Sequence, residues 1–472
     1  MCTAAFAAAL AVAACGDAPT TVVPVIDLPV DDLDATATPL DQITVTVAHA
    51  GNDRDLVSQT FARGERIEVP GIPFGDDLVI HMTGFIGAST VAYGRTCAFA
   101  VSPGGTPPTP HLFFSRSVRF ASLDIVPESR LGGFGIDYQG AGLLIGGHTA
   151  NGAPIPDVER FDPGTAKLAV LGSVTARDGA VQAVVGTSPP RVIVLGGAMG
   201  GGGATFVELI DAGGIDRSET TGLARIDLTA TALSDGSVVV IGGSPPGPAQ
   251  PSSEIDLVAE DGGALDIHRL DATLATARAG HTATRLGNDV GAPVLIAGGL
   301  DATGTPIAAA ELFKPLTGEV LASFKAAMNI PRHGHAAALL PNGDVLIIGG
   351  LDALDRPVRT LEQFSIDSGF VTVGDLPMAA GVIELAATTL PDGRILLTGG
   401  RPSPDSPPVT AAYIARLDPR DGQVDVVATD HMQTARAAHQ AMSLCDGTVL
   451  ISGGAAGQVP AERYNPPPLG RR

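Results

Sequence analysis

The chain has 472 residues, of which 60 are Gly and 37 are Pro, while only 17% are charged and none is Trp. This composition favours short strands joined by tight turns around an aliphatic core, and so an all-β fold. The formal net charge of −21 argues against a nucleic-acid partner, because phosphate binding requires neutralisation by Lys and Arg.

The N-terminal segment predicts export. Residues 4–14 form an apolar run of signal-peptide length, well short of the ~20 residues that a membrane-spanning helix needs. The run ends in Val12-Ala13-Ala14-Cys15-Gly16, which resembles the lipobox of bacterial lipoproteins. In that family the signal peptide is cleaved before the Cys, which is then acylated. The resemblance implies that residues 1–15 are a lipoprotein signal and that Cys15 is the lipidation site.

The residue after Cys15 bears on location. It is Gly16 and not Asp, which by resemblance to Gram-negative lipoproteins implies a lipid anchor in the outer membrane, with the periplasmic or cell-surface side left open. The alternative is an ordinary secretory signal that happens to contain a Cys.

Two regions precede a repeat. Residues 16–42 are rich in Asp, Pro and Thr and contain no Lys or Arg, which predicts a disordered acidic tether. From 43 to 116 the hydrophobic pattern alternates with period two, as in a small β-sandwich. We expect strands at 43–47, 66–69, 78–82 and 96–101.

The remainder of the chain, 117–472, is built on a repeat. An apolar run closed by a Gly pair occurs seven times, at intervals of 46 to 56 residues. Asp-Gly or Asn-Gly before several of these runs predicts tight hairpins. The Gly pairs are Gly146-Gly147, Gly196-Gly197, Gly242-Gly243, Gly298-Gly299, Gly349-Gly350, Gly399-Gly400 and Gly453-Gly454.

Charged residues keep register with the Gly pairs. An Arg opens the expected first strand in six copies, and a Glu opens the expected third strand in six. The Arg residues are Arg130, Arg177, Arg225, Arg278, Arg332 and Arg436. The Glu residues are Glu159, Glu208, Glu254, Glu311, Glu362 and Glu462.

In combination these features resemble the kelch repeat, over roughly 122–466. The resemblance implies a seven-bladed kelch-type β-propeller with four antiparallel strands in each blade. The chain ends too soon after the last Gly pair for a fourth strand, so we expect 117–124 to supply it and close the ring. Aliphatic residues must replace the Trp of many kelch fourth strands.

The recurring Arg and Glu residues allow two interpretations. They form structural ion pairs, or the Arg residues form a cationic, anion-binding ring at the mouth of the central channel. The copy that contains Gly399-Gly400 has Val382 in place of the Arg and, if Asp418-Pro419 sets the alignment, Ala415 in place of the Glu. This joint loss favours pairing, because each partner is costly to bury without the other.

The sequence offers little catalytic chemistry. The galactose oxidase family holds copper on a kelch propeller through two Tyr and two His, and that site cannot be mapped onto this chain. His281, His335 and His439 each follow a repeat Arg by three residues, but other copies carry Leu or Ala near that place, which favours packing. We expect no metal, no cofactor and no enzyme activity. The alternative is a carbohydrate-active enzyme, similar to a kelch sugar isomerase, acting at the channel mouth.

The expected function is binding. Variable loops between the second and third strands of each blade lie on one face of a rigid ring, where propellers usually bind partners. We expect a monomeric envelope protein that binds a protein or glycan there, with a purely architectural role as another option. Cys97 and Cys445 form an even pair in an exported chain and predict a disulfide, with two separate thiols as the alternative.

Overall fold

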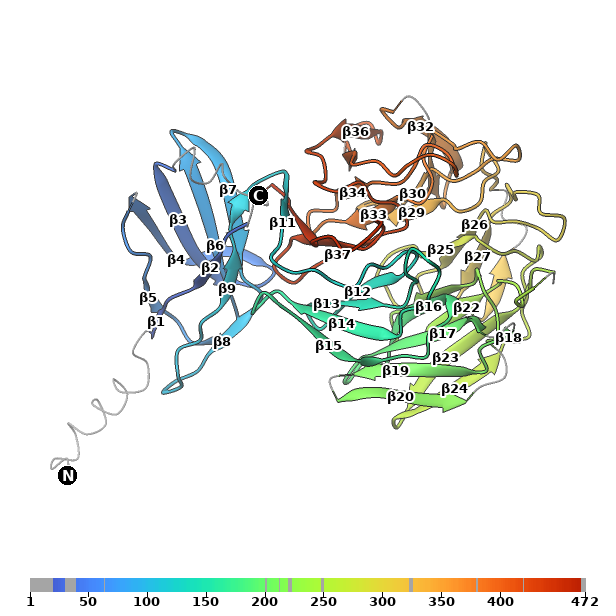
Figure 1. Ribbon diagram of the computed structural model, residues 1–472, viewed down its shortest axis with the longest axis horizontal. Helices are drawn as coiled ribbons and strands as arrows, with labels where there is room; N and C mark the ends of the chain where they lie inside the picture. The colour runs from blue at the N-terminus through green and yellow to red at the C-terminus, as the bar shows by residue number, and fades with distance from the viewer. Residues whose placement is uncertain are drawn as a thin grey trace.

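The computed structural model describes residues 20–29, 40–62, 64–199, 202–211, 213–219, 223–247, 250–321, 326–378, 381–418 and 420–467. Within these ranges the protein is all-β, as the composition predicted, and contains no helix. Figure 1 shows the N-terminal strands grouped beside a larger set of sheets that runs to the C-terminus. Cys15, the expected lipidation site, lies outside the described residues.

The N-terminal region contains one six-stranded sheet and two two-stranded sheets. The larger sheet has the order β10-β7-β6-β3-β4, with β8 beside β6, while β1 pairs with β5 and β2 with β9. Its strands are β3 (Gln42–His49), β4 (Asn52–Ala62), β6 (Gly75–Ile86), β7 (Ser89–Arg95), β8 (Phe99–Val101) and β10 (Ser115–Arg116). The short pairs are β1 (Thr20–Val22), β5 (Val69–Ile72), β2 (Val25–Asp27) and β9 (His111–Phe113).

The first described segment corrects the expectation of a disordered tether over 16–42 for residues 20–29, while residues 16–19 and 30–39 lie outside the described part of the chain. Residues 20–29 contain β1 and β2, and Val22 is fully buried in the same cluster as Val69 and Ile72. The run of apolar residues from Val22 to Ile26 outweighs the acidic composition of the segment, because part of it packs against the sheets of the N-terminal region. The expected strands also missed β4, β7, β9 and β10, and of the strand expected at 66–69 only Val69 lies in a strand, β5.

Seven further sheets follow in the described part of the chain, and we number them in order. The first contains β12 (Phe134–Tyr138), β13 (Ala141–Ile145), β14 (Asp157–Asp162) and β15 (Lys167–Ser173). The second contains β16 (Asp178–Val185), β17 (Arg191–Met199), β19 (Phe206–Asp211), β20 (Gly214–Glu219) and the short β18 (Gly202–Gly203). The third contains β21 (Thr229–Ala232), β22 (Val238–Ile241), β23 (Ile255–Asp261) and β24 (Ala264–Arg269).

The remaining four sheets keep the same antiparallel order. The fourth contains β25 (Thr282–Arg285), β26 (Val294–Ala297), β27 (Glu311–Lys314) and β28 (Glu319–Leu321). The fifth contains β29 (Ala336–Leu339), β30 (Val345–Ile348), β31 (Thr360–Ser365) and β32 (Gly369–Asp375). The sixth contains β33 (Ala386–Thr389), β34 (Ile395–Thr398), β35 (Ala412–Leu417) and β36 (Val424–Ala428). The seventh contains β37 (Gln440–Ser443), β38 (Val449–Ser452), β39 (Glu462–Asn465) and β11 (Arg119–Ser122).

The seventh sheet joins the two ends of the repeat region. Its outer strand, β11, comes from the start of the region and pairs with β39 near the C-terminus, with Arg119 opposite Asn465 and Ser122 opposite Glu462. Figure 1 shows β11 beside the last strands of the chain. The edge of β39 is therefore covered by a strand from 340 or so residues earlier.

Neighbouring sheets pack face to face through their second strands. In β22, β26, β30, β34 and β38 every residue is buried, which explains why these strands are apolar without alternation. The first strands of consecutive sheets contact one another, and β37 of the seventh sheet contacts β12 of the first. We call the side with the Gly pairs the loop end, and the side with the hairpins between first and second strands the turn end.

Candidate functional site

The recurring Arg residues are buried in ion pairs with the third strand of their own sheet. In five sheets an Arg nitrogen lies 2.6 to 3.1 Å from the Glu carboxylate, and these Arg side chains are at most 1% exposed. They cannot form an anion-binding ring at an open channel mouth, so that alternative is wrong. The pairs are Arg130–Glu159, Arg177–Glu208, Arg278–Glu311, Arg332–Glu362 and Arg436–Glu462.

The charged groups of each pair also form hydrogen bonds to nearby backbone carbonyl and N–H groups. Arg332 donates from Nη1 to the carbonyls of Gly349 at 3.2 Å and Thr360 at 2.9 Å. Glu362 accepts the N–H groups of Asn329 at 2.6 Å and Ile330 at 3.1 Å. Burial lowers the pKa of Arg332, and the Glu362 carboxylate opposes that shift. The pair therefore ties the Gly-Gly turn and the segment that enters the first strand to the third strand.

The third sheet uses a different carboxylate. Arg225 forms its buried contact with Asp256, whereas Glu254, the expected partner, is 3.6 Å away with its side chain 37% exposed. Asp256 lies opposite Val240 on β22, the register that Glu362 has opposite Ile347 on β30. Burial lowers the pKa of Arg225, and Asp256 opposes the shift most strongly.

Among its described residues the sixth sheet contains no such pair, but the residue that replaces the Glu is not the one expected. Tyr413 lies opposite Leu397, two residues before the Gly pair, and so holds the position of the Glu; Ala415 lies opposite Ile395. Val382 is 2% exposed and packs in one cluster with Leu397 and Tyr413. An aliphatic and an aromatic side chain thus replace the two charged ones.

The three recurring His residues are packing elements, as the sequence favoured. His281, His335 and His439 are 5 to 8% exposed, and each contacts a Thr hydroxyl through Nε2 at 2.8 to 3.1 Å. Burial lowers the pKa of each to about 3, so all three are neutral. Each ring lies against the first Gly of the preceding sheet's pair, where a Cβ would meet it.

A ring of left-handed residues marks the loop end. Two positions after each repeat Arg, or after Val382, φ lies between 49° and 67°. Four of these residues donate their N–H to the equivalent carbonyl of the preceding sheet at 2.9 to 3.2 Å, including Gly132 to Ala438, which links the first sheet to the seventh. This entrance ring consists of Gly132, Gly179, Asp227, Gly280, Gly334, Glu384 and Ala438.

Beside the entrance ring lies a pocket of about 390 Å³, between the first and second sheets. Phe134, His148, Arg177 and Asp178 contribute side chains to its lining, with the Arg177 guanidinium in its ion pair with Glu208. Gly132, Gly147, Gly152 and Gly179 leave backbone accessible. Among the described residues none hydrogen-bonds to the side chain of His148 or Asp178. Sequence reasoning missed this pocket because its lining residues come from three segments that only folding brings together.

The N-terminal region is fastened to the seventh sheet. Cys97 and Cys445, 348 residues apart, form a disulfide with their Cα atoms 5.0 Å apart. Arg95 donates from Nη1 to the carbonyl of Cys445 at 2.6 Å. Asn465 on β39 donates from Nδ2 to the carbonyl of Tyr93 at 2.8 Å and to Ser115.

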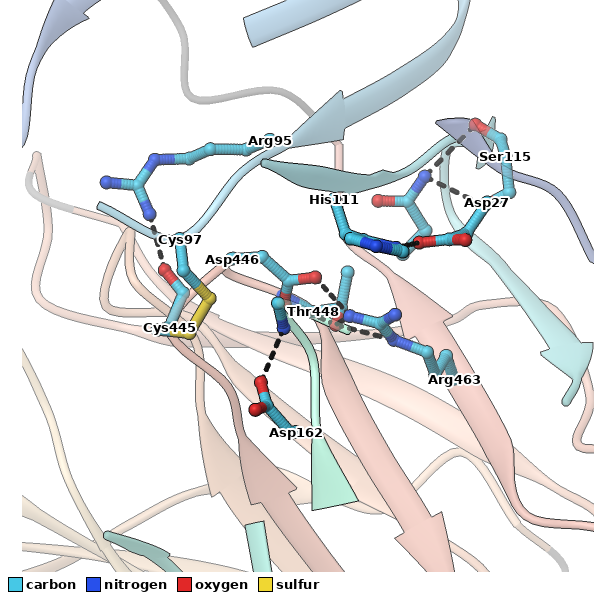
Figure 2. Close-up of polar contacts among 12 residues, drawn as sticks. Asp27, Arg95, Cys97, His111, Ser115, Asp162, Cys445, Asp446, Thr448 and Arg463 are labelled. Atoms are coloured by element: carbon cyan, nitrogen blue, oxygen red, sulfur yellow. Dashed lines mark hydrogen bonds and ion pairs between the residues drawn. A yellow bond between two sulfur atoms is a disulfide. The ribbon is translucent and has the colours of Figure 1, made fainter. Parts of the chain in front are cut away.

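Arg463 is the centre of this junction. Its guanidinium, fully buried, pairs with Asp446 and donates to Thr448, as Figure 2 shows beside the disulfide. The same guanidinium lies over Phe113 of β9 at 4.3 Å and near Phe161 of β14 at 5.6 Å. One cation therefore joins the N-terminal region to the first and seventh sheets.

Among the described residues, no group of three or more His, Cys, Asp or Glu side chains is arranged to hold a metal ion. No helix in the same part of the chain has the length and apolar character needed to cross a membrane.

Comparison with known proteins adds no assignment. No protein family matches the chain, and no curated protein is significantly similar to it.

Proposed function

We propose that this chain is a lipid-anchored envelope protein that binds a glycan at the loop end of a seven-bladed, kelch-type propeller. Three features support the propeller. Seven sheets of at least four strands succeed one another in the described residues, their first strands are in contact from β12 to β37 and back to β12, and β11 completes the seventh sheet.

Inter-sheet hydrogen bonds support the same arrangement. The second Gly of a pair donates its N–H to the carbonyl at the Arg position of the next sheet, as Gly299 does to Arg332 and Gly350 to Val382. Gly454 of the seventh sheet makes this bond to Arg130 of the first at 2.7 Å. A circular order of sheets accounts for that contact between residues 324 positions apart.

The loop-end pocket carries the proposal of glycan binding. An aromatic face, an unpaired carboxylate and an imidazole are the groups that hold the C–H face and hydroxyls of a sugar. Phe134, Asp178 and His148 supply them, and the surrounding glycines let a ligand approach the backbone. Arg177, which also lines the pocket, is already paired with Glu208 at 2.7 Å, and this disfavours an anionic ligand there.

The test is binding of purified full-length protein to an array of neutral envelope oligosaccharides. We expect Asp178→Ala and His148→Ala each to reduce binding at least about tenfold, the loss of one or two hydrogen bonds. Asp405→Ala, at the loop end of the sixth sheet, is the matched control and should bind as the wild type does. Retention of glycan binding by the Asp178 and His148 variants would refute this pocket as the site.

The anchor has a separate test. Metabolic labelling with a palmitate analogue should mark the wild type, and Cys15→Ser should abolish the label. Labelling that survives the substitution would remove lipidation at Cys15 from the proposal.

A further inference from the structure

A second cavity lies at the opposite, turn end of the sheets, under the N-terminal region. It has a volume of about 250 Å³ and is lined by residues from β6 and β7, from the hairpin turns of the sixth and seventh sheets, and from the segment after β39. It is separate in the fold from the loop-end pocket, which is lined by segments at the other end of the first and second sheets.

The cavity contains one cation without an acidic partner. The Arg95 guanidinium lines it, and its hydrogen bond among the described residues goes to the Cys445 carbonyl. No described carboxylate pairs with Arg95. The Arg95 side chain is partly buried, so part of its positive charge is removed from water without a carboxylate to neutralise it. Its remaining N–H donors form a fork suited to a carboxylate from outside the protein.

The two acidic residues of the lining are already paired with other cations. Asp446 is in the buried ion pair with Arg463, and Asp392 is in an ion pair with Arg394. Neither carboxylate is therefore left to neutralise Arg95, and the positive charge of the cavity is not cancelled from within.

The rest of the lining is suited to a compact apolar body. Pro391, Pro466 and Pro467 present rigid apolar rings, and Tyr93 adds an aromatic side chain. The Tyr93 hydroxyl and His81 Nδ1 are 2.6 Å apart, which fixes the orientation of both rings. A cavity that is mostly apolar with one oriented charge is the usual design of a small-molecule site.

The disulfide keeps this site in shape. Arg95 is two residues before Cys97, and Asp446 follows Cys445 directly, so the cation and one wall are attached to the two ends of the same covalent link. Figure 2 shows Arg95 and the disulfide side by side, with Asp446 next to them. The Arg95 fork is therefore held in place before any ligand arrives.

From these contacts we propose that the cavity is a binding site for a small organic carboxylate. Its carboxylate is bound by the Arg95 guanidinium, and its apolar body lies between Tyr93 and the proline rings. The volume limits the ligand to a single small ring or a short branched chain.

The test is calorimetric titration of the full-length protein with cyclohexanecarboxylate, with cyclohexylmethanol as a neutral analogue of the same shape. A ligand of about nine heavy atoms is expected to bind with a Kd on the order of 1 mM. We expect the alcohol to bind at least about tenfold more weakly, because it cannot pair with the guanidinium.

Two variants test whether the carboxylate binds at Arg95. Arg95→Gln should lower the affinity for the carboxylate at least about tenfold, and Arg95→Lys, which keeps the charge without the fork, should give an intermediate value. Asp178→Ala, at the loop end, should leave this affinity unchanged. Circular dichroism and quantification of free thiols establish that the variants are folded with the disulfide formed, and Arg95→Lys provides the test if Arg95→Gln fails to fold.

Three results would overturn the proposal. They are no binding of the carboxylate up to about 10 mM, ten times the expected Kd; equal binding of the acid and the alcohol; and an affinity that is the same in the wild type and both Arg95 variants.

Discussion

The fifth and sixth sheets have the same strand order, but the described residues of the sixth lack the buried ion pair of the fifth. The fifth has Arg332 and Glu362, fully buried and 2.6 Å apart. The sixth has Val382 in the same place before its first strand, and Tyr413 in the register of the Glu. The backbone contact is preserved, because the carbonyl of either residue accepts an N–H from the preceding Gly pair.

This difference shows that the sheet does not require the ion pair. Two charges removed from water regain the cost of desolvation only when their geometry is good, and apolar replacements of similar volume are often equally stable. In the sixth sheet both positions have changed together, so neither charge is left buried without its partner. Both sheets keep the backbone carbonyl at the Arg position as a hydrogen-bond acceptor. The side chain of that residue is either an Arg paired with a carboxylate or an aliphatic Val packed against Tyr.

The largest effect is expected from breaking one pair. Glu362→Ala leaves Arg332 buried without its carboxylate and should lower the free energy of unfolding by about 3–5 kcal/mol. Urea denaturation followed by circular dichroism measures it. Glu254→Ala in the third sheet is the matched control, since Arg225 pairs with Asp256 instead, and should cost at most about 1 kcal/mol.

Equal costs for Glu362→Ala and Glu254→Ala would contradict the assignment of Asp256 as the third sheet's partner. Asp256→Ala then shows directly which carboxylate pairs with Arg225, because it should lower the free energy of unfolding by as much as Glu362→Ala does.

A double substitution gives the fifth sheet the residue types that the sixth sheet has at these two positions. Arg332→Val with Glu362→Tyr should cost about 1–2 kcal/mol, less than either single change, because no unpaired charge remains buried. The double-mutant cycle, measured by urea denaturation, should give a coupling energy of at least about 2 kcal/mol. Additive single effects would mean that the two positions do not exchange as a unit.

How far the sequence predicts this structure depends on how faithfully each residue repeats. The all-β class, the buried second strands and the Arg–Glu contacts follow from spacing, since the same chemistry recurs at similar intervals. Asp256 and Tyr413 could not be found this way, because each changes residue type, and the aligned Glu254 and Ala415 lie two residues away along the chain.

The pockets lay beyond the reach of sequence patterns for another reason. Arg95 and Asp446 meet because the N-terminal region docks on the seventh sheet. The predicted Cys97–Cys445 disulfide brings their two segments together, but no pattern in the sequence shows that a cavity forms between them. The strands β1 and β2 were missed since the acidic composition of 16–42 suggested disorder, whereas Val22 is buried through a pairing with a distant strand.

The same two sheets differ at the residue after the entrance ring, and this predicts a pH effect. The fifth has His335 and the sixth has Leu385. Burial, with a smaller contribution from Arg332, lowers the pKa of His335 to about 3. Below a pH of about 6.5 the unfolded chain takes up a proton that folded His335 does not, so this residue reduces stability progressively as the pH falls from about 6.5 to 3.

His335→Leu should remove that contribution. Relative to the wild type, the variant should gain about 2 kcal/mol between pH 8 and pH 5, which is 1.5 pH units at about 1.4 kcal/mol each. Urea denaturation at both pH values measures the difference. A wild type and variant whose stabilities change in parallel with pH would mean that His335 is protonated in the folded protein.

The smallest expected effect concerns the entrance ring itself, where the fifth sheet has Gly334 and the sixth has Glu384, with φ of 60° and 57°. A Cβ at Gly334 would have no heavy atom within 4 Å, so Gly334→Ala tests the backbone conformation alone. It should lower the free energy of unfolding by about 1 kcal/mol, the penalty of a left-handed residue with a side chain.

Ala438→Gly in the seventh sheet should raise the free energy of unfolding by a similar amount, since Ala438 has a φ of 49°. Thermal denaturation of both variants should shift Tm in opposite directions. Shifts of the same sign would mean that the bonds to the preceding sheet do not hold these residues in the left-handed conformation. In that case Glu384 would have no backbone strain for its ion pair with Arg401, at 2.8 Å, to offset.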